Sequence, residues 1–230
     1  MRKLMVDLAM RLGLYKWCVD IDTRIRNRKI AKSFHRYGLE TLQKGDEAVS
    51  SFGGHLVMYF GTLLGAIREH GFIAHDNDLD MAIPIEDRPD NFVEIMEQHG
   101  FMHFQQTYIK STGRIIEDRF CYKGCQMDIF YLFSDREDGK VYSYIGRRHE
   151  TKEWREANAT DGFPVDVWPT EKCGYVRQDF LGMQLYVPEK AHEWMRDIYG
   201  DDYMTPIKEW DVKKQKKTLM EHTTLRAYRR

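Results

Sequence analysis

The feature that most constrains this chain is a short run of carboxylates, DNDLDMAI at residues 76–83. Polar and apolar residues alternate along it, and this pattern predicts a half-buried strand. Asp78 and Asp80 then share one face, and their Cα atoms lie about 6.6 Å apart at a rise of about 3.3 Å per residue. Two such carboxylates repel each other unless a cation lies between them, and Mg²⁺ or Mn²⁺ prefers oxygen ligands of this kind. The run therefore predicts a site for a divalent metal ion.

The same acids suit two other structures. Asp76, Asp78 and Asp80 occupy the first, third and fifth places of an EF-hand calcium loop, and Asp87 occupies the twelfth. The sixth place requires glycine for its sharp turn but carries Met81, which argues against the calcium loop. A solvated acidic turn that binds no metal is the other alternative.

A Gly-Thr turn precedes the acids. The apolar HLVMYF at residues 55–60 predicts a buried strand that Gly61 ends, and Thr62 is expected to cap the helix LLGAIREHG that follows. Glycine lets the backbone approach a phosphate closely, and a helix start favours anionic oxygen. Gly61 and Thr62 are therefore candidates for binding a donor phosphate. Arg68, on the same helix, is expected to contact a substrate phosphate or to pair with the acids, with a structural ion pair as the alternative.

A third acid lies in a later apolar run, QMDIFYLF at residues 126–133. Its single carboxylate, Asp128, is expected to be buried, which is costly unless the group is paired or binds a metal. An arginine or backbone amides could be that partner. Together with Asp78 and Asp80, however, Asp128 makes a candidate triad of metal ligands and catalytic acids.

Charge and hydropathy restrict the classes of partner. The 230 residues suit one large domain, and 35 Lys and Arg residues balance 36 Asp and Glu residues, so nothing points to nucleic acid. No apolar run approaches the roughly 20 residues that span a bilayer, and the first residues lack the pattern of a secretory signal, so we expect a cytoplasmic protein. The four cysteines lack zinc-site spacing and are expected to be reduced, with a disulfide between Cys121 and Cys125 as the alternative.

The remaining pattern predicts elements on both sides of these motifs. Helices are expected over residues 4–19, 38–50 and 191–200, and antiparallel strands over residues 101–109, 114–122 and 126–133. The chain is expected to comprise a helical N-terminal extension at residues 1–50, a catalytic domain at residues 51–206, and a basic tail at residues 207–230. We expect this tail to be helical and packed on the same domain.

The order of these features resembles the nucleotidyltransferase fold superfamily and, within it, the LicD family with the related fukutin group. The resemblance rests on GTLLGAIREHGFIAHDNDLDMAI at residues 61–83, MDIF at 127–130, and VPEK with YGDDYMTP within 187–206. It implies an α+β fold with a mixed sheet flanked by helices and with helical additions at both ends. His75 departs from the family pattern, since many relatives carry Trp there, and this leaves the identity of the donor open.

The resemblance also implies an activity: transfer of phosphocholine or a phospho-alditol from a CDP-linked donor to a hydroxyl of a cell-surface glycan, with release of CMP. By position, Gly61 and Thr62 become the donor-phosphate turn, Arg68 a donor contact, and Asp78, Asp80 and Asp128 the catalytic and metal-binding acids. Mg²⁺ or Mn²⁺ is the expected cofactor.

The implied acceptor is a glycan or glycolipid, which would place the protein in the cytoplasm or at the inner face of the membrane. Two alternatives stay open. One is an NTP-dependent nucleotidyltransferase that modifies a small molecule or a protein and releases pyrophosphate. The other is a non-catalytic scaffold that binds a metal.

Overall fold

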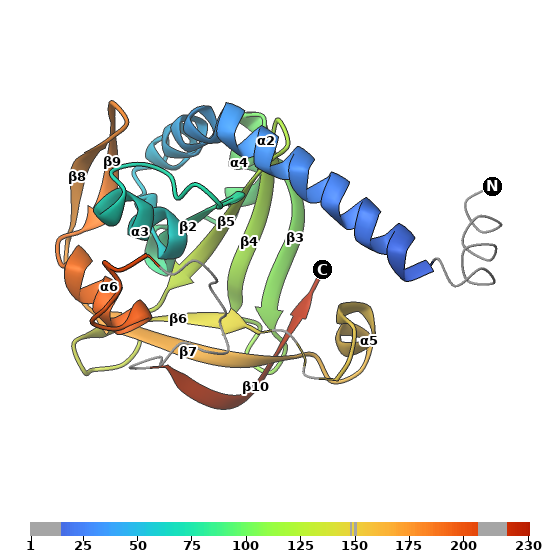
Figure 1. Cartoon of the computed structure of the whole chain (residues 1–230). Coiled ribbons are helices and arrows are strands. Elements are labelled where there is room, and N and C mark those ends of the chain that lie inside the picture. Colours follow the sequence, from blue (N-terminus) through green and yellow to red (C-terminus); the bar gives the residue numbers. More distant parts are fainter. Residues whose placement is uncertain (1–14, 148, 150, 207–219) are drawn as a thin grey trace.

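The computed structural model describes residues 15–147, 149, 151–206 and 220–230, and these form helices around one mixed ten-stranded sheet (Figure 1). The strand order is β6-β7-β10-β3-β4-β5-β2-β1-β9-β8. The strands are β1 (Val57–Met58), β2 (Asp78–Pro84), β3 (Met102–Ile109), β4 (Ile115–Tyr122), β5 (Cys125–Leu132), β6 (Lys140–Gly146), β7 (Phe163–Glu171), β8 (Tyr175–Phe180), β9 (Met183–Pro188) and β10 (Glu221–Arg229). The α+β fold with flanking helices is as predicted.

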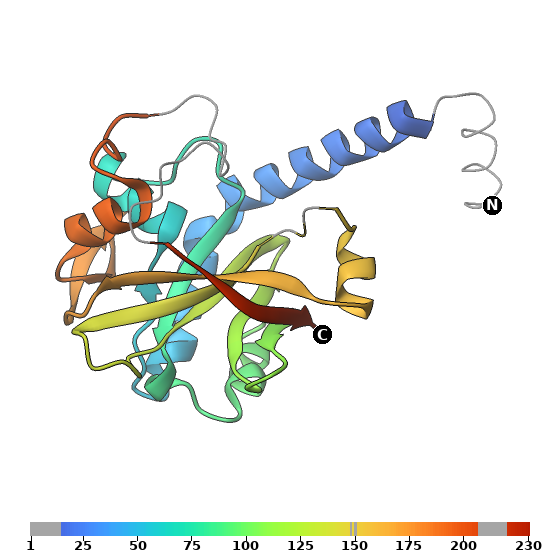
Figure 2. The same ribbon diagram turned by 90° about the horizontal axis from the view of Figure 1, so that it is seen from below.

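The sheet is strongly curved. Strands β6, β7 and β10 cross β3, β4 and β5 at a steep angle, as Figures 1 and 2 show from two directions. An isolated bridge between Phe133 and Tyr142 joins the chain just after β5 to β6. Strands at opposite ends of the run β6-β7-β10-β3-β4-β5 therefore meet again, and this part of the sheet resembles a partly closed barrel.

The helices are α2 (Tyr15–Ser50), α3 (Phe60–Arg68), α4 (Phe92–Gln98), α5 (Trp154–Ala159) and α6 (Ala191–Tyr199), with a 3-10 turn at Ile85–Asp87. Helices α2 and α4 pack on the side of the sheet that presents Met127 and Phe120. Gly45 of α2 allows this close approach, because a Cβ atom there would lie 2.9 Å from Cε of Met127. Helices α3 and α6 pack against each other and against β2 and β7, respectively.

The N-terminal region differs from the prediction in one respect. Residues 15–50 form one continuous helix, whereas separate helices over 4–19 and 38–50 were expected. Gly38 does not interrupt it; the ring of Phe72 would lie 3.3 Å from a Cβ atom at this position, so glycine serves close packing. Residues 4–14 of the expected first helix lie outside the described residues.

The predicted helical tail is wrong for residues 221–229, which form β10. This strand pairs antiparallel with both β7 and β3 and so lies inside the sheet. Its sequence, EHTTLRAYR, contains two threonines and a tyrosine, which suit a strand, and β7 and β3 offer it hydrogen-bonding partners on both sides. Residues 207–219 of the tail lie outside the described residues.

The antiparallel run β3-β4-β5 and the helix that Gly200 ends are confirmed. Cys121 and Cys125 are both free, so the alternative of a disulfide between them is not borne out. Within the part of the chain that the structure describes, no helix is both long and apolar enough to cross a membrane.

Candidate active site

The three predicted acids come together because β2 and β5 are adjacent parallel strands. Asp80 is the register partner of Asp128, and Asp78 lies two register positions away, opposite Gln126. Leu79, between the two acids of β2, is fully buried on the opposite face. Because side chains alternate along a strand, burial of this residue holds Asp78 and Asp80 on the face that they share with Asp128.

The Gly-Thr turn lies directly beside these acids. Phe60 adopts a left-handed backbone conformation with φ of 33°, which makes the sharp turn from β1 into α3 and is uncommon for a residue with a side chain. Gly61 then donates its N–H to Oδ2 of Asp80 at 3.0 Å. A Cβ atom at Gly61 would lie 3.2 Å from Asp80 Oδ2 and 3.3 Å from Asp76 Oδ2. Glycine therefore leaves room for two carboxylates at the start of the helix.

Thr62 does not cap α3 as predicted. The cap position is Tyr59, which makes no hydrogen bond to the helix through its side chain. The Thr62 hydroxyl instead accepts the backbone N–H of Asp80 at 2.9 Å. With the bond from Gly61 to Asp80, this contact joins the start of α3 to the acidic strand and determines where the Asp80 carboxylate lies.

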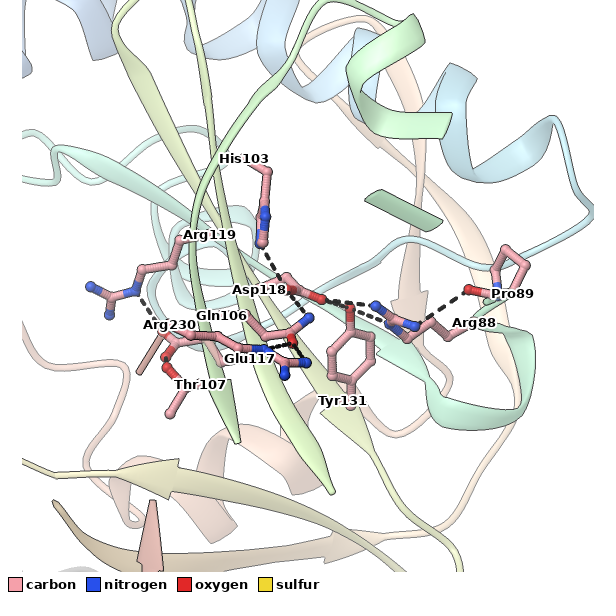
Figure 3. Close-up of polar contacts among 10 residues, drawn as sticks. All are labelled: Arg88, Pro89, His103, Gln106, Thr107, Glu117, Asp118, Arg119, Tyr131 and Arg230. Atoms are coloured by element: carbon pink, nitrogen blue, oxygen red, sulfur yellow. Dashed lines mark hydrogen bonds and ion pairs between the residues drawn. The ribbon is translucent and has the colours of Figure 1, made fainter. Parts of the chain in front are cut away.

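Asp128 is 3% exposed and has two partners. Gln126 Nε2 donates to its Oδ1 at 2.7 Å, and Arg119 Nη2 lies 3.1 Å from its Oδ2. Arg119 also donates from Nε to Glu117 at 2.8 Å, and Glu117 accepts a further bond from the Thr107 hydroxyl, as Figure 3 shows. Arg119 is thus the counter-ion of two buried carboxylates.

Two residues of this site, Arg119 and Asp76, were not predicted from the sequence. Arg119 belongs to EDR at residues 117–119, and three charged residues inside an otherwise apolar strand were a usable signal. Asp76 was considered only as a calcium ligand, yet its carboxylate faces Gly61 beside Asp80. Only the path of the chain between α3 and β2 brings Asp76 to this position.

The acids carry more negative charge than their surroundings compensate. Burial raises the pKa of Asp80 well above its usual range, and repulsion from Asp78 and Asp128 raises it further. Burial raises the pKa of Asp128 to about 7 although Arg119 opposes the shift, and it raises the pKa of Asp76 to about 6. Burial also raises the pKa of Asp78. All four carboxyl groups are therefore less readily ionised than in water.

The chemistry of these side chains fits a hard divalent cation, which would supply the missing positive charge. Across residues 15–147, 149, 151–206 and 220–230, no three acidic, histidine or cysteine side chains are already arranged to hold a metal. Both oxygens of Asp128 instead contact Gln126 or Arg119. The metal-binding roles of Asp78, Asp80 and Asp128 stay a prediction.

Arg68 lies on the last turn of α3 and is engaged elsewhere. Its Nε donates to Glu69 at 2.8 Å, and its Nη1 donates to the carbonyl oxygen of Tyr203 at 3.2 Å. Its positive charge also acts on Asp76. Arg68 therefore connects the helix to the segment YGDDYMTP, and its predicted contact with the donor is untested.

Asp118, a buried carboxylate on the opposite face of β4 from Glu117 and Arg119, provides a contrast. It is fully buried and is the acceptor for His103, Gln106, Tyr131 and Arg88, as Figure 3 shows. Burial opposes ionisation of Asp118, but these contacts outweigh it and lower its pKa. A carboxylate so well satisfied stabilises the packing of β3, β4 and β5, whereas the acids beside Gly61 lack such compensation.

A mixed sheet in which a Gly-Thr turn meets an Asp-x-Asp strand, with a further acid on the parallel neighbour, points to a nucleotidyltransferase-type domain. Comparison with known families agrees, since residues 53–190 match the model of the "LicD/FKTN/FKRP, nucleotidyltransferase domain". The chain belongs to the LicD/FKTN/FKRP family.

The individual relatives found by sequence comparison share little sequence identity with this chain. The chain is 22% identical over 192 residues to the ribitol-5-phosphate transferase FKTN of Macaca fascicularis and 21% identical over 192 residues to that of Homo sapiens. The corresponding Mus musculus protein is 22% identical over 191 residues. These matches cover 80% of this chain but only 36% to 37% of the relatives. The chain thus spans little more than a third of the length of these curated relatives.

Proposed function

We propose that this protein transfers a phospho-alcohol, either phosphocholine or a phospho-alditol, from a CDP-linked donor to a hydroxyl of a glycan and releases CMP. Family membership supports a transferase of this class, and the FKTN relatives are named as transferases of ribitol 5-phosphate. The observation that carries the proposal is the placement of Asp78, Asp80 and Asp128 on one face of the β2-β5 pair beside Gly61.

The carboxylates suit this chemistry. Asp78, Asp80 and Asp128 would hold a divalent metal ion, with Asp76 beside them. When bound, Mg²⁺ or Mn²⁺ would neutralise charge on the donor diphosphate and on the leaving CMP. Gly61 leaves space at the start of α3 for the donor phosphates to approach, and the dipole of the helix favours their charge.

The bond changes follow from this arrangement. The acceptor oxygen attacks the phosphorus distal to the nucleoside, a new P–O bond forms, and the P–O bond to CMP breaks with its electron pair passing to CMP. The hydroxyl proton is taken up by a carboxylate, for which Asp128 is the candidate because it lies beside Asp80 on the neighbouring strand. No nucleophile from the protein is needed, since positioning and charge stabilisation dominate phosphoryl transfer.

A thermal-shift screen tests donor binding first. CDP-choline, CDP-ribitol, CDP-glycerol and CDP-ethanolamine are each added with Mg²⁺, and the cognate donor is expected to raise Tm because it binds only the folded protein. The selected donor is then incubated with the enzyme and glycan fractions, and release of CMP is measured by chromatography.

The matched variants are Asp80→Ala in the site and Asp90→Ala on the exposed turn before α4. We expect Asp80→Ala to abolish CMP release while its circular dichroism spectrum stays native, and Asp90→Ala to behave as the wild type. Full turnover by Asp80→Ala would contradict the proposal. Release of pyrophosphate from an NTP, with no CMP from any CDP-linked donor, would favour a nucleotidyltransferase instead.

A further inference from the structure

A pocket of about 420 Å³ lies apart from the three acids, between α5 and strands β3, β7 and β10. Gln105 of β3, Phe163 of β7 and Arg229 of β10 line its inner part. Lys152 and Trp154 line it at the start of α5, where Trp154 is 51% exposed. The pocket therefore combines an aromatic surface with polar groups, as binding sites for small ligands do.

A row of polar residues connects this pocket with the candidate active site. On four neighbouring strands, Asp80 pairs with Asp128, Asp128 with Arg119, and Arg119 with Gln105. These register partners lie on the same face of the sheet. Three strand-to-strand steps of about 4.8 Å place the end of the row roughly 14 Å from its start. The acids therefore lie on the same face of the sheet as Gln105.

Two residues that line the pocket each carry a buried hydrogen-bond donor without a partner in the described part of the chain. Gln105 Nε2 and Arg229 Nε are both shielded from solvent, and neither has a hydrogen-bond partner among the described residues. An unsatisfied buried donor costs about 1–3 kcal/mol, so such a group calls for an explanation. A ligand that supplies acceptor oxygens would satisfy both.

Arg229 makes no ion pair with an acidic side chain among the described residues, and its own charge therefore suits an anionic group. Glu117 and Asp128 attract its guanidinium, but both acids pair with Arg119, which repels it. Its guanidinium also lies 4.6 Å from the centre of the Phe163 ring, and Asn158 of α5 holds its backbone through hydrogen bonds in both directions. Arg229 is therefore held in place beside the pocket, and its Nε has no hydrogen-bond partner among the described residues.

The other charged groups of the pocket do not satisfy Arg229. Lys152 is paired with Asp161 at 2.7 Å, which offsets its charge. Glu153 lines the pocket and is exposed, so it can accept hydrogen bonds from hydroxyl groups. The exposed ring of Trp154 offers a flat surface for the apolar face of a sugar. This combination suits a sugar that carries one acidic group.

We propose that this pocket binds the acceptor of the transfer reaction, a sugar unit that carries a phosphate or carboxylate group. Arg229 and Gln105 contact the anionic oxygen, Trp154 packs against the ring, and the rest of the glycan extends along the polar row toward Asp128. The assignment of this sugar as the acceptor rests on the proposed function. The preference of the pocket for an anionic sugar is independent of that function.

The test measures binding without donor or metal. Trp154 fluorescence is followed while glucose 6-phosphate, glucuronate, inorganic phosphate or neutral glucose is added, and Trp154→Phe identifies the signal of the pocket. We expect saturable binding of both anionic sugars, tighter than that of inorganic phosphate or glucose. Arg229→Gln should raise the apparent Kd of the anionic sugars about tenfold or more, because it removes a charged donor.

Two matched variants make the result specific. Arg226→Gln carries the same change on the same strand at an exposed position outside the pocket lining, and it should bind as the wild type does. Asp80→Asn should also leave sugar binding unchanged, because it alters only the other end of the row. Circular dichroism confirms that each variant is folded.

Three outcomes overturn the proposal. The first is that neither anionic sugar binds better than glucose, or that none binds saturably. The second is equal binding by Arg229→Gln and Arg226→Gln. The third is that CMP competes with the anionic sugars for the pocket, which would assign it to the nucleoside. If no CDP-linked donor binds while the sugar results hold, the proposed function fails and the anionic-sugar site stands.

Discussion

Asp76 provides a sharp test of how charge is balanced in the candidate active site. Its carboxylate faces Gly61 beside Asp80, and burial raises its pKa from 3.8 to about 6. The folded state therefore binds a proton more tightly than the unfolded state does. The favourable contribution of the protonated group is complete below the unfolded pKa and is lost as the pH rises through about 4 to 6. At pH 8 the ionised carboxylate destabilises the metal-free fold.

The substitution Asp76→Asn removes this charge at nearly constant shape. A shift of about two pKa units corresponds to about 3 kcal/mol, which we reduce to about 1–2 kcal/mol because the side chain is only partly buried. For a chain of this size, each kcal/mol changes Tm by about 2–4 °C. Without metal at pH 8, Asp76→Asn should therefore melt about 2–8 °C above the wild type.

The assay is thermal unfolding followed by circular dichroism in EDTA between pH 4 and pH 8. The advantage of Asp76→Asn should shrink as the pH falls toward 4, because the wild-type carboxyl group becomes protonated. Addition of Mg²⁺ should stabilise the wild type more than the variant, since a ligand of the folded state raises stability by mass action. Asp90→Asn, on an exposed turn, is the control and should show neither effect. A variant less stable than the wild type at pH 8, or a difference independent of pH, would refute the reasoning.

Three further substitutions test the contacts around the site. Arg119→Gln should destabilise the protein by about 3 kcal/mol in urea unfolding, because Asp128 and Glu117 lose their shared cation; a loss below about 0.5 kcal/mol would show that the two acids need no counter-ion. Thr62→Val should cost about 1–3 kcal/mol, because a β2 amide loses its acceptor, and an unchanged urea midpoint would argue against that bond. Asp118 has a lowered pKa, so its contribution is present above the unfolded pKa and is lost as the pH falls. Asp118→Asn should be less stable at pH 7 and flatten the acid side of the stability profile, and a parallel profile would contradict this.

Local patterns were sufficient to predict much of the site. The alternation in DNDLDMAI places Asp78 and Asp80 on one strand face, because side chains alternate along any strand. The lone Asp128 in an apolar run indicated a carboxylate that needs a partner, and the structure places it beside Asp80. The order of turn, acidic strand and later acid also led to the family that the comparison confirms.

Other features depend on residues far apart in the chain. The tail was predicted to be helical, but residues 221–229 form β10, which pairs with β7 on one side and with β3 on the other. Thr62 was predicted to cap a helix, but in the fold it meets the amide of a strand that begins sixteen residues later.

The sequence by itself therefore determined which acidic residues are candidates for the site and that Asp78 and Asp80 share one strand face. Both follow from the spacing of polar and apolar residues within single segments. Only the tertiary structure decided that Asp76 faces Gly61, that Arg119 pairs with Asp128, and that Gln105 and Arg229 line one pocket. The physical reason is that these contacts depend on strand order and register. Both are set by hydrogen bonding and burial summed over the whole sheet rather than by any one segment.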